Sequence, residues 1–277
     1  MGNDDLLDLA FESKDDKLDD FNVRFYKIDK CWSVIRYNGK SEEVIFPESY
    51  KGKPIKEIRF SCFSKNQRKR IKRVVIPEGY TYIGHSAFED CKGLTEINLP
   101  QSLTYIGSWA FQGCTGLTSI KLPKNLISIG NNGDMPRSLI EYSFGDLGDM
   151  TFAFCTRLKN IEFPEGLTFI GASVFYGCTG LTEIKFPEGL TSIGERAFLR
   201  CTGLKSIILP ESLTCIEEAA FSGCTGLKSI IIPESLTYIK SYTFQGCKNL
   251  QTVTLSRKTR IEDDAFEGFK GQFIYRD

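Results

Sequence analysis

Apolar side chains recur at fixed places in a 23-residue unit that fills most of the chain. Residues 190–210, LTSIGERAFLRCTGLKSIILP, show the unit clearly, and consecutive copies run over residues 167–233. Residues 117–122, LTSIKL, carry apolar side chains at the first, fourth and sixth place, which predicts a short strand with one face inward. Residues 103–107, LTYIG, predict a second short strand. Each unit is therefore expected to form one coil with a parallel strand on each side.

The other residues of each unit predict the turns of the coil. In residues 110–114, AFQGC, Phe111 and Cys114 lie three apart and share a face at helical spacing. Gly116, just before the next strand, suits a left-handed turn. Pro123 ends that strand, because proline lacks the N–H that a strand inside a sheet donates.

Three residue types keep the same phase along the chain. The closing prolines are Pro77, Pro100, Pro123, Pro164, Pro187, Pro210 and Pro233. The cysteines in phase are Cys91, Cys114, Cys155, Cys178, Cys201, Cys224 and Cys247. The phenylalanines three positions before them are Phe88, Phe111, Phe152, Phe175, Phe198, Phe221 and Phe244. Degenerate copies at Phe63 and Phe266 raise the total to about nine coils, which predicts a β-rich α/β solenoid with two short parallel sheets, roughly 43 Å long.

The pattern LTxIxxxAFxxCxxLxxIxLPxxL, which covers about residues 44 to 277, resembles the bacterial BspA-like, Treponema-type leucine-rich repeat. The resemblance implies a leucine-rich-repeat solenoid that serves as a non-enzymatic adhesion or protein-binding scaffold. It also implies a protein that is secreted or held at the cell surface. No catalytic residue is implied, because the shared positions are core positions.

The pattern divides the chain into three segments. Residues 1–20 form an acidic N-terminal segment, which is either a loosely ordered tail or a short amphipathic helix on the first coil. Residues 21–46 alternate apolar and polar side chains around a central Asp-Lys pair, which predicts a hairpin that caps the first coil. Residues 47–277 form the solenoid.

Two stretches interrupt the regular coils. Residues 131–148 are an insertion at the corner after a second strand, and Tyr142 and Phe144 would give it an apolar tip. This loop either packs locally or contacts a ligand. Residues 65–73 carry six cations, which suits either an anion-binding patch or a solvated corner. We favour the corner, because no aromatic side chains are interleaved for stacking on bases.

Composition narrows the function. The chain has 35 cationic and 35 anionic side chains, so the whole molecule does not attract nucleic acid or an anionic membrane. One histidine, His85, leaves no second imidazole for a dyad, triad or histidine-based metal site. We expect no catalysis, no cofactor, no metal and no membrane insertion. The acidic start lacks the pattern of a secretory signal, which favours the cytoplasm if Met1 is the native start.

The ten cysteines admit two interpretations. Stacked coils bring cysteines in phase near the distance of a disulfide, but parallel side chains in register point alongside each other and not toward each other. We therefore expect a ladder of buried free thiols that act as small apolar groups. Cys215 is out of phase at an outward place of a strand, so we expect it to react first.

Outward positions of the strands are the candidate binding surfaces. On the LxxIxLP side, Ile208 and Ile231 form a small apolar patch, and its polar rim includes Lys185, Lys205 and Lys228.

On the LTxIG side, the outward aromatic residues are Tyr82, Tyr105, Phe169 and Tyr238. Exposed aromatic side chains often anchor protein contacts, although such residues also stabilise neighbouring strands when nothing binds. Three functions stay open: a scaffold for a host or matrix protein, an intracellular scaffold, and a carbohydrate-binding surface protein. The oligomeric state is open as well.

Overall fold

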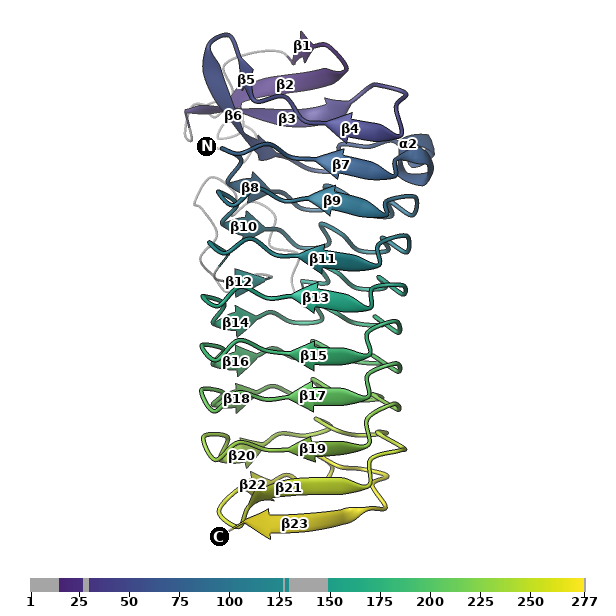
Figure 1. Ribbon diagram of the computed structural model, residues 1–277, viewed down its shortest axis with the longest axis vertical. Helices are drawn as coiled ribbons and strands as arrows, with labels where there is room; N and C mark the ends of the chain where they lie inside the picture. Colours follow the sequence, from purple (N-terminus) through teal and green to yellow (C-terminus); the bar gives the residue numbers. More distant parts are fainter. Residues whose placement is uncertain (1–14, 27–29, 127, 130–148, 277) are drawn as a thin grey trace, which may run out of the picture.

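The repeats stack into an elongated solenoid with one coil per repeat (Figure 1). The computed structural model describes residues 15–26, 30–126, 128–129 and 149–276. Most of the acidic N-terminal segment and the whole insertion 131–148, with Tyr142 and Phe144, therefore lie outside the described residues. None of the helices in those ranges is long and apolar enough to cross a membrane.

One side of the coils, called the front face here, carries the LxxIxLP strands. Its strands are β4 (Glu43–Ile45), β7 (Arg73–Val75), β9 (Glu96–Asn98), β11 (Ser119–Lys121), β13 (Asn160–Glu162), β15 (Glu183–Lys185), β17 (Ser206–Ile208), β19 (Ser229–Ile231), β21 (Thr252–Ser256) and β23 (Gln272–Arg276). Where neighbouring strands pair, the pairing is parallel and in register, as for Ile184 beside Ile207. The central side chain of each three-residue strand points inward, and the flanking two point to solvent, as in β15.

The opposite side, the back face, carries the LTxIG strands. Its strands are β6 (Lys53–Ile58), β8 (Tyr82–Ile83), β10 (Tyr105–Ile106), β12 (Ser128–Ile129), β14 (Phe169–Ile170), β16 (Ser192–Ile193), β18 (Cys215–Ile216), β20 (Tyr238–Ile239) and β22 (Arg260–Ile261). They also pair in parallel, as Ile170 does with Ile193. The predicted solenoid with two parallel sheets is confirmed.

An antiparallel ribbon covers the first coil. It consists of β1 (Asp16–Leu18), β2 (Phe21–Tyr26) and β3 (Cys31–Tyr37), and β3 continues in parallel onto β6. A short strand, β5 (Ser49–Tyr50), also pairs with β6. The Phe21 ring packs 5.3 Å from the Phe46 ring, between centroids, and so covers the apolar end of the stack. β4, at the end of the segment predicted as a cap, pairs with β7 and belongs to the front sheet.

A column of phenylalanine rings runs through the core. From Phe88 to Phe266, consecutive rings in this column lie 5.1–5.6 Å apart between centroids, with interplanar angles of 14° or less. Phe111 stacks on Phe152 at 5.2 Å, so the insertion between these two repeats does not break the column. The predicted vertical alignment of residues one repeat apart is therefore confirmed.

The cysteines in phase form a second buried column without disulfides. Each thiol from Cys114 onward donates to the carbonyl of the phenylalanine in the preceding coil, as Cys178 does to Phe152 at 3.0 Å and Cys201 to Phe175 at 3.1 Å. Cysteine therefore fills a small apolar space and gives a second hydrogen bond to a carbonyl that already accepts the N–H of the cysteine in its own coil. Burial raises the pKa of Cys91 to about 12, and it raises the pKa of the other ladder thiols as well.

The turn between the two faces differs from the prediction. Most turns have two left-handed residues, one two positions before and one two positions after the phenylalanine, for example Trp109 at φ +61° and Gly113 at φ +69°. Gly116 is not left-handed. A Cβ atom there would lie 2.5 Å from the Leu94 carbonyl oxygen of the preceding coil, so Gly116 permits close packing of two backbones.

The basic run forms the helix α2 (Lys65–Arg70) and the start of β7. Arg73 pairs with Glu43 and Glu96, and Lys72 pairs with Glu42 at 2.7 Å. These neighbours neutralise much of the charge, as expected of a solvated corner.

Replacing one stacked ring should strongly destabilise the whole solenoid. Phe198→Ala leaves a cavity between two rings, so we expect the free energy of unfolding, from urea titration, to fall by about 3–5 kcal/mol. The control is Phe154→Ala, because Phe154 is 39% exposed and should cost less than about 1 kcal/mol. Equal losses from the two variants would contradict a core role for the column.

The thiol ladder should make the protein sensitive to alkali. The folded-state pKa of each thiol is raised, so this contribution to stability is complete below about pH 8.5, the pKa of an unfolded thiol, and is lost as pH rises toward 12. We expect each ladder thiol to lower the free energy of unfolding by about 1.4 kcal/mol per pH unit in that window. Urea unfolding between pH 8 and 10 measures the slope, and Cys201→Ala should make it shallower. If Cys201→Ala leaves the slope of the free energy of unfolding against pH unchanged, ionisation of the ladder thiols is not the cause of the sensitivity to alkali.

Candidate functional site

An isoleucine patch stands out on the front face near the C-terminal coils. Ile208 on β17 is 52% exposed and Ile231 on β19 is 60% exposed. The same column continues through Thr254 to Ile274, which is 43% exposed on β23. Lys185 lies directly beside Ile208 in register, so a lysine borders the patch at its upper end. The predicted apolar patch is thus accessible and is longer than the sequence suggested.

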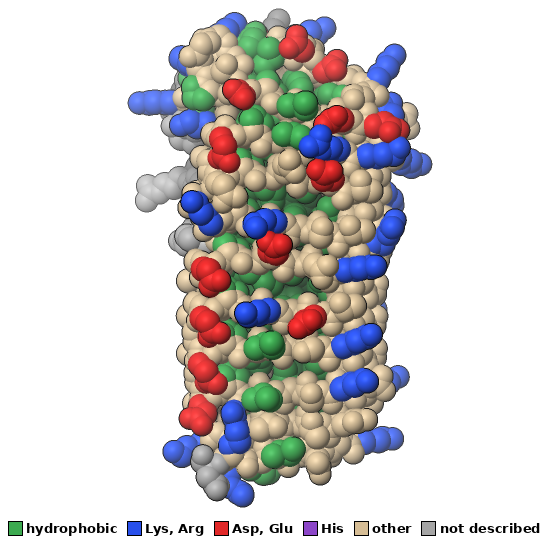
Figure 2. Space-filling view, viewed as in Figure 1, with side chains coloured by type: hydrophobic (Ala, Val, Ile, Leu, Met, Phe, Trp, Pro, Cys, Tyr) green, Lys and Arg blue, Asp and Glu red, His purple; other side chains and the backbone are tan. Residues whose placement is uncertain are grey.

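Opposite charges line the two margins of this face (Figure 2). Exposed lysines stand just before the strands on one margin: Lys159, Lys205 and Lys228. Exposed glutamates follow the closing prolines on the other margin: Glu165, Glu188, Glu211 and Glu234. The isoleucine patch therefore lies between a basic margin and an acidic margin.

In the middle coils the centre of the front face is charged instead of apolar. Lys121 on β11 pairs with Glu162 on β13 at 3.0 Å across the sheet. Exposed ion pairs of this kind contribute little stability and offer no apolar surface. Ile45 on β4 is 62% exposed as well, but its in-register neighbour Val75 is half-buried, whereas Ile208 and Ile231 are both exposed on adjacent coils. The C-terminal half of the face is therefore better suited to a protein contact.

On the back face, the expectation that Tyr82 and Tyr105 are exposed is wrong. They are only 8% and 9% exposed, and their rings stack at 5.0 Å between centroids with an angle of 10°. In-register stacking covers each ring with its neighbour. Glu57 continues this column, is also buried, and accepts hydrogen bonds at 2.7 Å from Ser33 and Arg59.

Farther along the back face, the predicted aromatic residues are more accessible but separated. Phe169 is half-buried, and Tyr238 is 40% exposed and donates a hydrogen bond to Glu262. Ser192 and Cys215 stand between them in the column. These two aromatic side chains therefore form no common surface.

Cys215 is half-buried, whereas the other nine cysteines are buried, so the prediction that it reacts first among the thiols agrees with the structure, although its own pKa is raised. Burial and the neighbouring Glu217 carboxylate, which accepts its S–H at 3.1 Å, raise the pKa of Cys215. A raised pKa lowers the fraction of thiolate, which is the reactive species.

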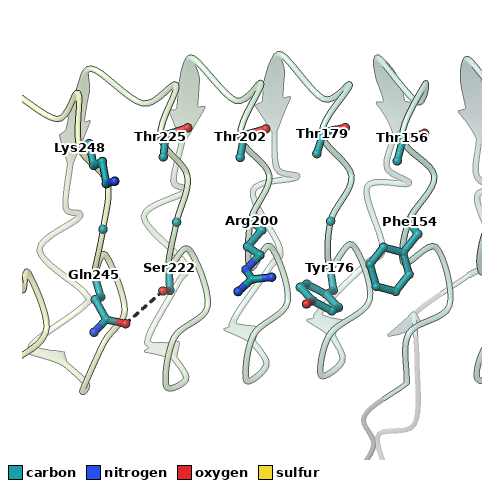
Figure 3. Close-up of a pocket in the computed structure, with 13 residues that line it drawn as sticks. Phe154, Thr156, Tyr176, Thr179, Arg200, Thr202, Ser222, Thr225, Gln245 and Lys248 are labelled. Atoms are coloured by element: carbon teal, nitrogen blue, oxygen red, sulfur yellow. Dashed lines mark hydrogen bonds between the residues drawn. The ribbon is translucent and has the colours of Figure 1, made fainter.

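The structure shows a further surface, an open groove on the turns that join the two faces (Figure 3). Its volume is about 640 Å³ and it crosses five coils. One row of its lining consists of Phe154, Tyr176, Arg200, Ser222 and Gln245, and the other consists of Thr156, Thr179, Thr202, Thr225 and Lys248. The glycines Gly177, Gly223 and Gly246 lie between the rows.

Two bulky side chains of the groove occupy left-handed backbone positions. Phe154 has φ +58° and Arg200 has φ +59°, whereas the equivalent residues of neighbouring coils are the glycines Gly177 and Gly223. This conformation costs a residue with a Cβ atom about 1–2 kcal/mol.

One of these glycines also provides space for the side chain of the preceding coil. A Cβ atom on Gly177 would lie 2.9 Å from the ring of Phe154, and one on Gly223 would lie 3.4 Å from the Arg200 side chain. Phe154 therefore depends on glycine in the next coil, whereas the distance at Gly223 is an ordinary van der Waals contact.

Sequence reasoning missed this groove, although the chain carried a signal. The position two residues after the phenylalanine is glycine in most coils, and Asp90, Phe154 and Arg200 interrupt that column. These three residues indicate a distinct surface only once that position is known to have a left-handed backbone and to point outward.

Comparison with known proteins agrees with this architecture. A family model described as the BspA type leucine rich repeat region, in 6 copies, matches residues 37–133 and 145–271. A leucine-rich repeat protein of T. pallidum is similar in structure, with a TM-score of 0.65 and 26% identity over 77% of this chain and 91% of its own. One from Bacteroides ovatus has a TM-score of 0.62 and 27% identity over 90% of this chain and 67% of its own. No curated protein matches the chain.

Because Arg200 has a left-handed backbone, glycine should be more stable than alanine at this position, the reverse of the order expected at most positions. Arg200→Gly should be more stable than Arg200→Ala by about 1 kcal/mol in urea unfolding, because only alanine retains the steric strain. Thr202 does not have a positive φ, so Thr202→Gly should be less stable than Thr202→Ala. If the glycine and alanine variants have the same order of stability at positions 200 and 202, the backbone at Arg200 is not strained.

Proposed function

The chain belongs to the BspA-type leucine-rich repeat family, and from that membership we propose that it is a non-enzymatic scaffold that binds a partner protein through its front face. The observation that carries the proposal is the exposure of Ile208 and Ile231 on adjacent coils of the front face. Single exposed apolar side chains are common, but neighbouring ones that form a patch with a polar rim mark surfaces that bind proteins.

The charge pattern describes the partner. An interface centred on Ile208 and Ile231 would be flanked by Lys205 and Lys228 on one margin and by glutamates on the other. A complementary protein would present an apolar centre between one acidic and one basic margin. Such complementarity speeds association and fixes the orientation of the partner, while the apolar centre supplies most of the affinity.

Adhesion to a host or matrix protein at the cell surface is the form of this function that we favour, by resemblance to surface proteins of the family. The alternative is an intracellular scaffold, which suits the reduced thiols of the ladder. Fractionation of the native cells separates the two: protein in the surface fraction supports adhesion, and protein confined to the cytosol supports the alternative.

A double substitution tests the patch. Ile208→Asp with Ile231→Asp should weaken partner binding at least 10-fold, because two carboxylates would be desolvated in the interface. Fragments of matrix proteins displayed on phage are selected on the native chain, and their affinities for both chains are then compared by biolayer interferometry. Both substituted side chains point outward, so circular dichroism should show unchanged thermal unfolding.

The matched control is Tyr238→Asp, an exposed position on the back face. It should leave the affinity of the selected fragments unchanged. If Tyr238→Asp lowers the affinity more than the double variant does, the binding surface lies on the back face. Equal affinity of the selected fragments for the native chain and the double variant would show that the isoleucine patch is not the binding surface.

A further inference from the structure

The groove on the turns carries an inference that is independent of the front face. Of its lining residues, Arg200 and Lys248 are cationic and none is acidic. Both side chains are exposed, and neither forms an ion pair with any residue in the described ranges. Two uncompensated cations in one groove favour an anionic ligand.

The groove also contains an aromatic surface and a row of hydroxyl groups. The rings of Phe154 and Tyr176 meet at 4.9 Å between centroids at one end of the groove, and Phe154 is 39% exposed (Figure 3). Thr156, Thr179 and Thr202 are exposed along the facing row, and their hydroxyl groups bond to no described residue. A ligand with a flat apolar face and a polar rim would use both features.

The backbone of the groove argues against a peptide bound as an added strand. The N–H groups of its floor already donate to the next coil: Gly177 to Leu199 at 2.8 Å, and Gly223 to Gln245 at 2.7 Å. Strand addition needs free backbone groups along an edge, and the floor has none to offer among these residues. Recognition therefore depends on side-chain hydroxyl groups, rings and charges.

We propose that this groove binds an acidic polysaccharide. A sugar ring stacks its C–H face on Phe154 and Tyr176, its hydroxyl groups bond to the threonine row, and its carboxylate or sulfate groups pair with Arg200 and Lys248. Arg200 and Lys248 are two coils apart, or roughly 10 Å along the axis. A chain whose anionic groups recur at about that interval contacts both.

The left-handed backbone supports a binding role for Arg200. Glycine occupies the equivalent place in the following coils without strain, so the arginine is maintained at a cost in stability. Positive φ is not confined to the groove, since Asp90 and Arg196 adopt it as well, so the support comes from the departure from glycine at a position that lines the groove. Phe154, at the same position two coils earlier, is held in the same way.

Titration calorimetry with defined oligosaccharides tests the proposal on the full chain. The acidic probes are oligogalacturonate, hyaluronan and heparin oligosaccharides, and the neutral comparator is methyl-esterified oligogalacturonate. At least one acidic probe should bind, and Arg200→Gly should weaken that binding at least 10-fold while the protein stays folded. Phe154→Gly should weaken it as well, and methyl esterification should weaken binding of oligogalacturonate if that probe binds.

The matched control is Arg196→Gly. Arg196 is also an exposed arginine at a positive φ, +54°, but it pairs with Glu195 at 3.2 Å and does not line the groove. This variant removes one charge and one strained residue and should keep full affinity, as should the double front-face variant.

Three results would overturn the proposal. They are no binding of any acidic oligosaccharide, equal loss from Arg196→Gly and Arg200→Gly, and binding of poly-glutamate as tightly as the sugars.

Discussion

Vertical alignment of identical positions is the constraint on which this molecule depends. A phenylalanine ring in one coil packs face to face on the ring of the next, and the backbone of each turn donates to the following coil, as Phe175 does to Ala197 at 2.8 Å. No coil can bury its apolar side chains alone, so stability comes from the interfaces between coils. A change that shifts one ring disturbs two interfaces.

The same alignment determines what the surface can do. Each outward position becomes a column, and neighbouring side chains in a column cover or expose one another. Tyr82 and Tyr105 cover each other, whereas Ile208 and Ile231 leave more than half of their surface in solvent. Recognition on such a scaffold therefore arises where a column changes residue type, as it does at the isoleucine patch on the front face.

The groove follows a different rule, because its distinguishing side chains come from the turns. Position two after the phenylalanine must adopt a left-handed backbone, which selects glycine in most coils. Phe154 and Arg200 depart from that selection, and Phe154 requires glycine in the next coil to make room. The front face and the groove are thus separate surfaces with different chemistry, one apolar between charged margins and one cationic with an aromatic end.

The sequence by itself determined the period, the two-sheet coil, the buried phenylalanine and cysteine columns, and the outward direction of Ile208 and Ile231. Spacing is enough for these features, because residues one repeat apart must coincide once the coils stack. Only the tertiary structure decided that Tyr82 and Tyr105 are covered, that Gly113 and not Gly116 is left-handed, and that Phe154 and Arg200 line a groove. The exposure of a side chain depends on which side chains the neighbouring coils place over it. The position of the left-handed residue depends on how the turn closes. Neither follows from the order of residues within one repeat.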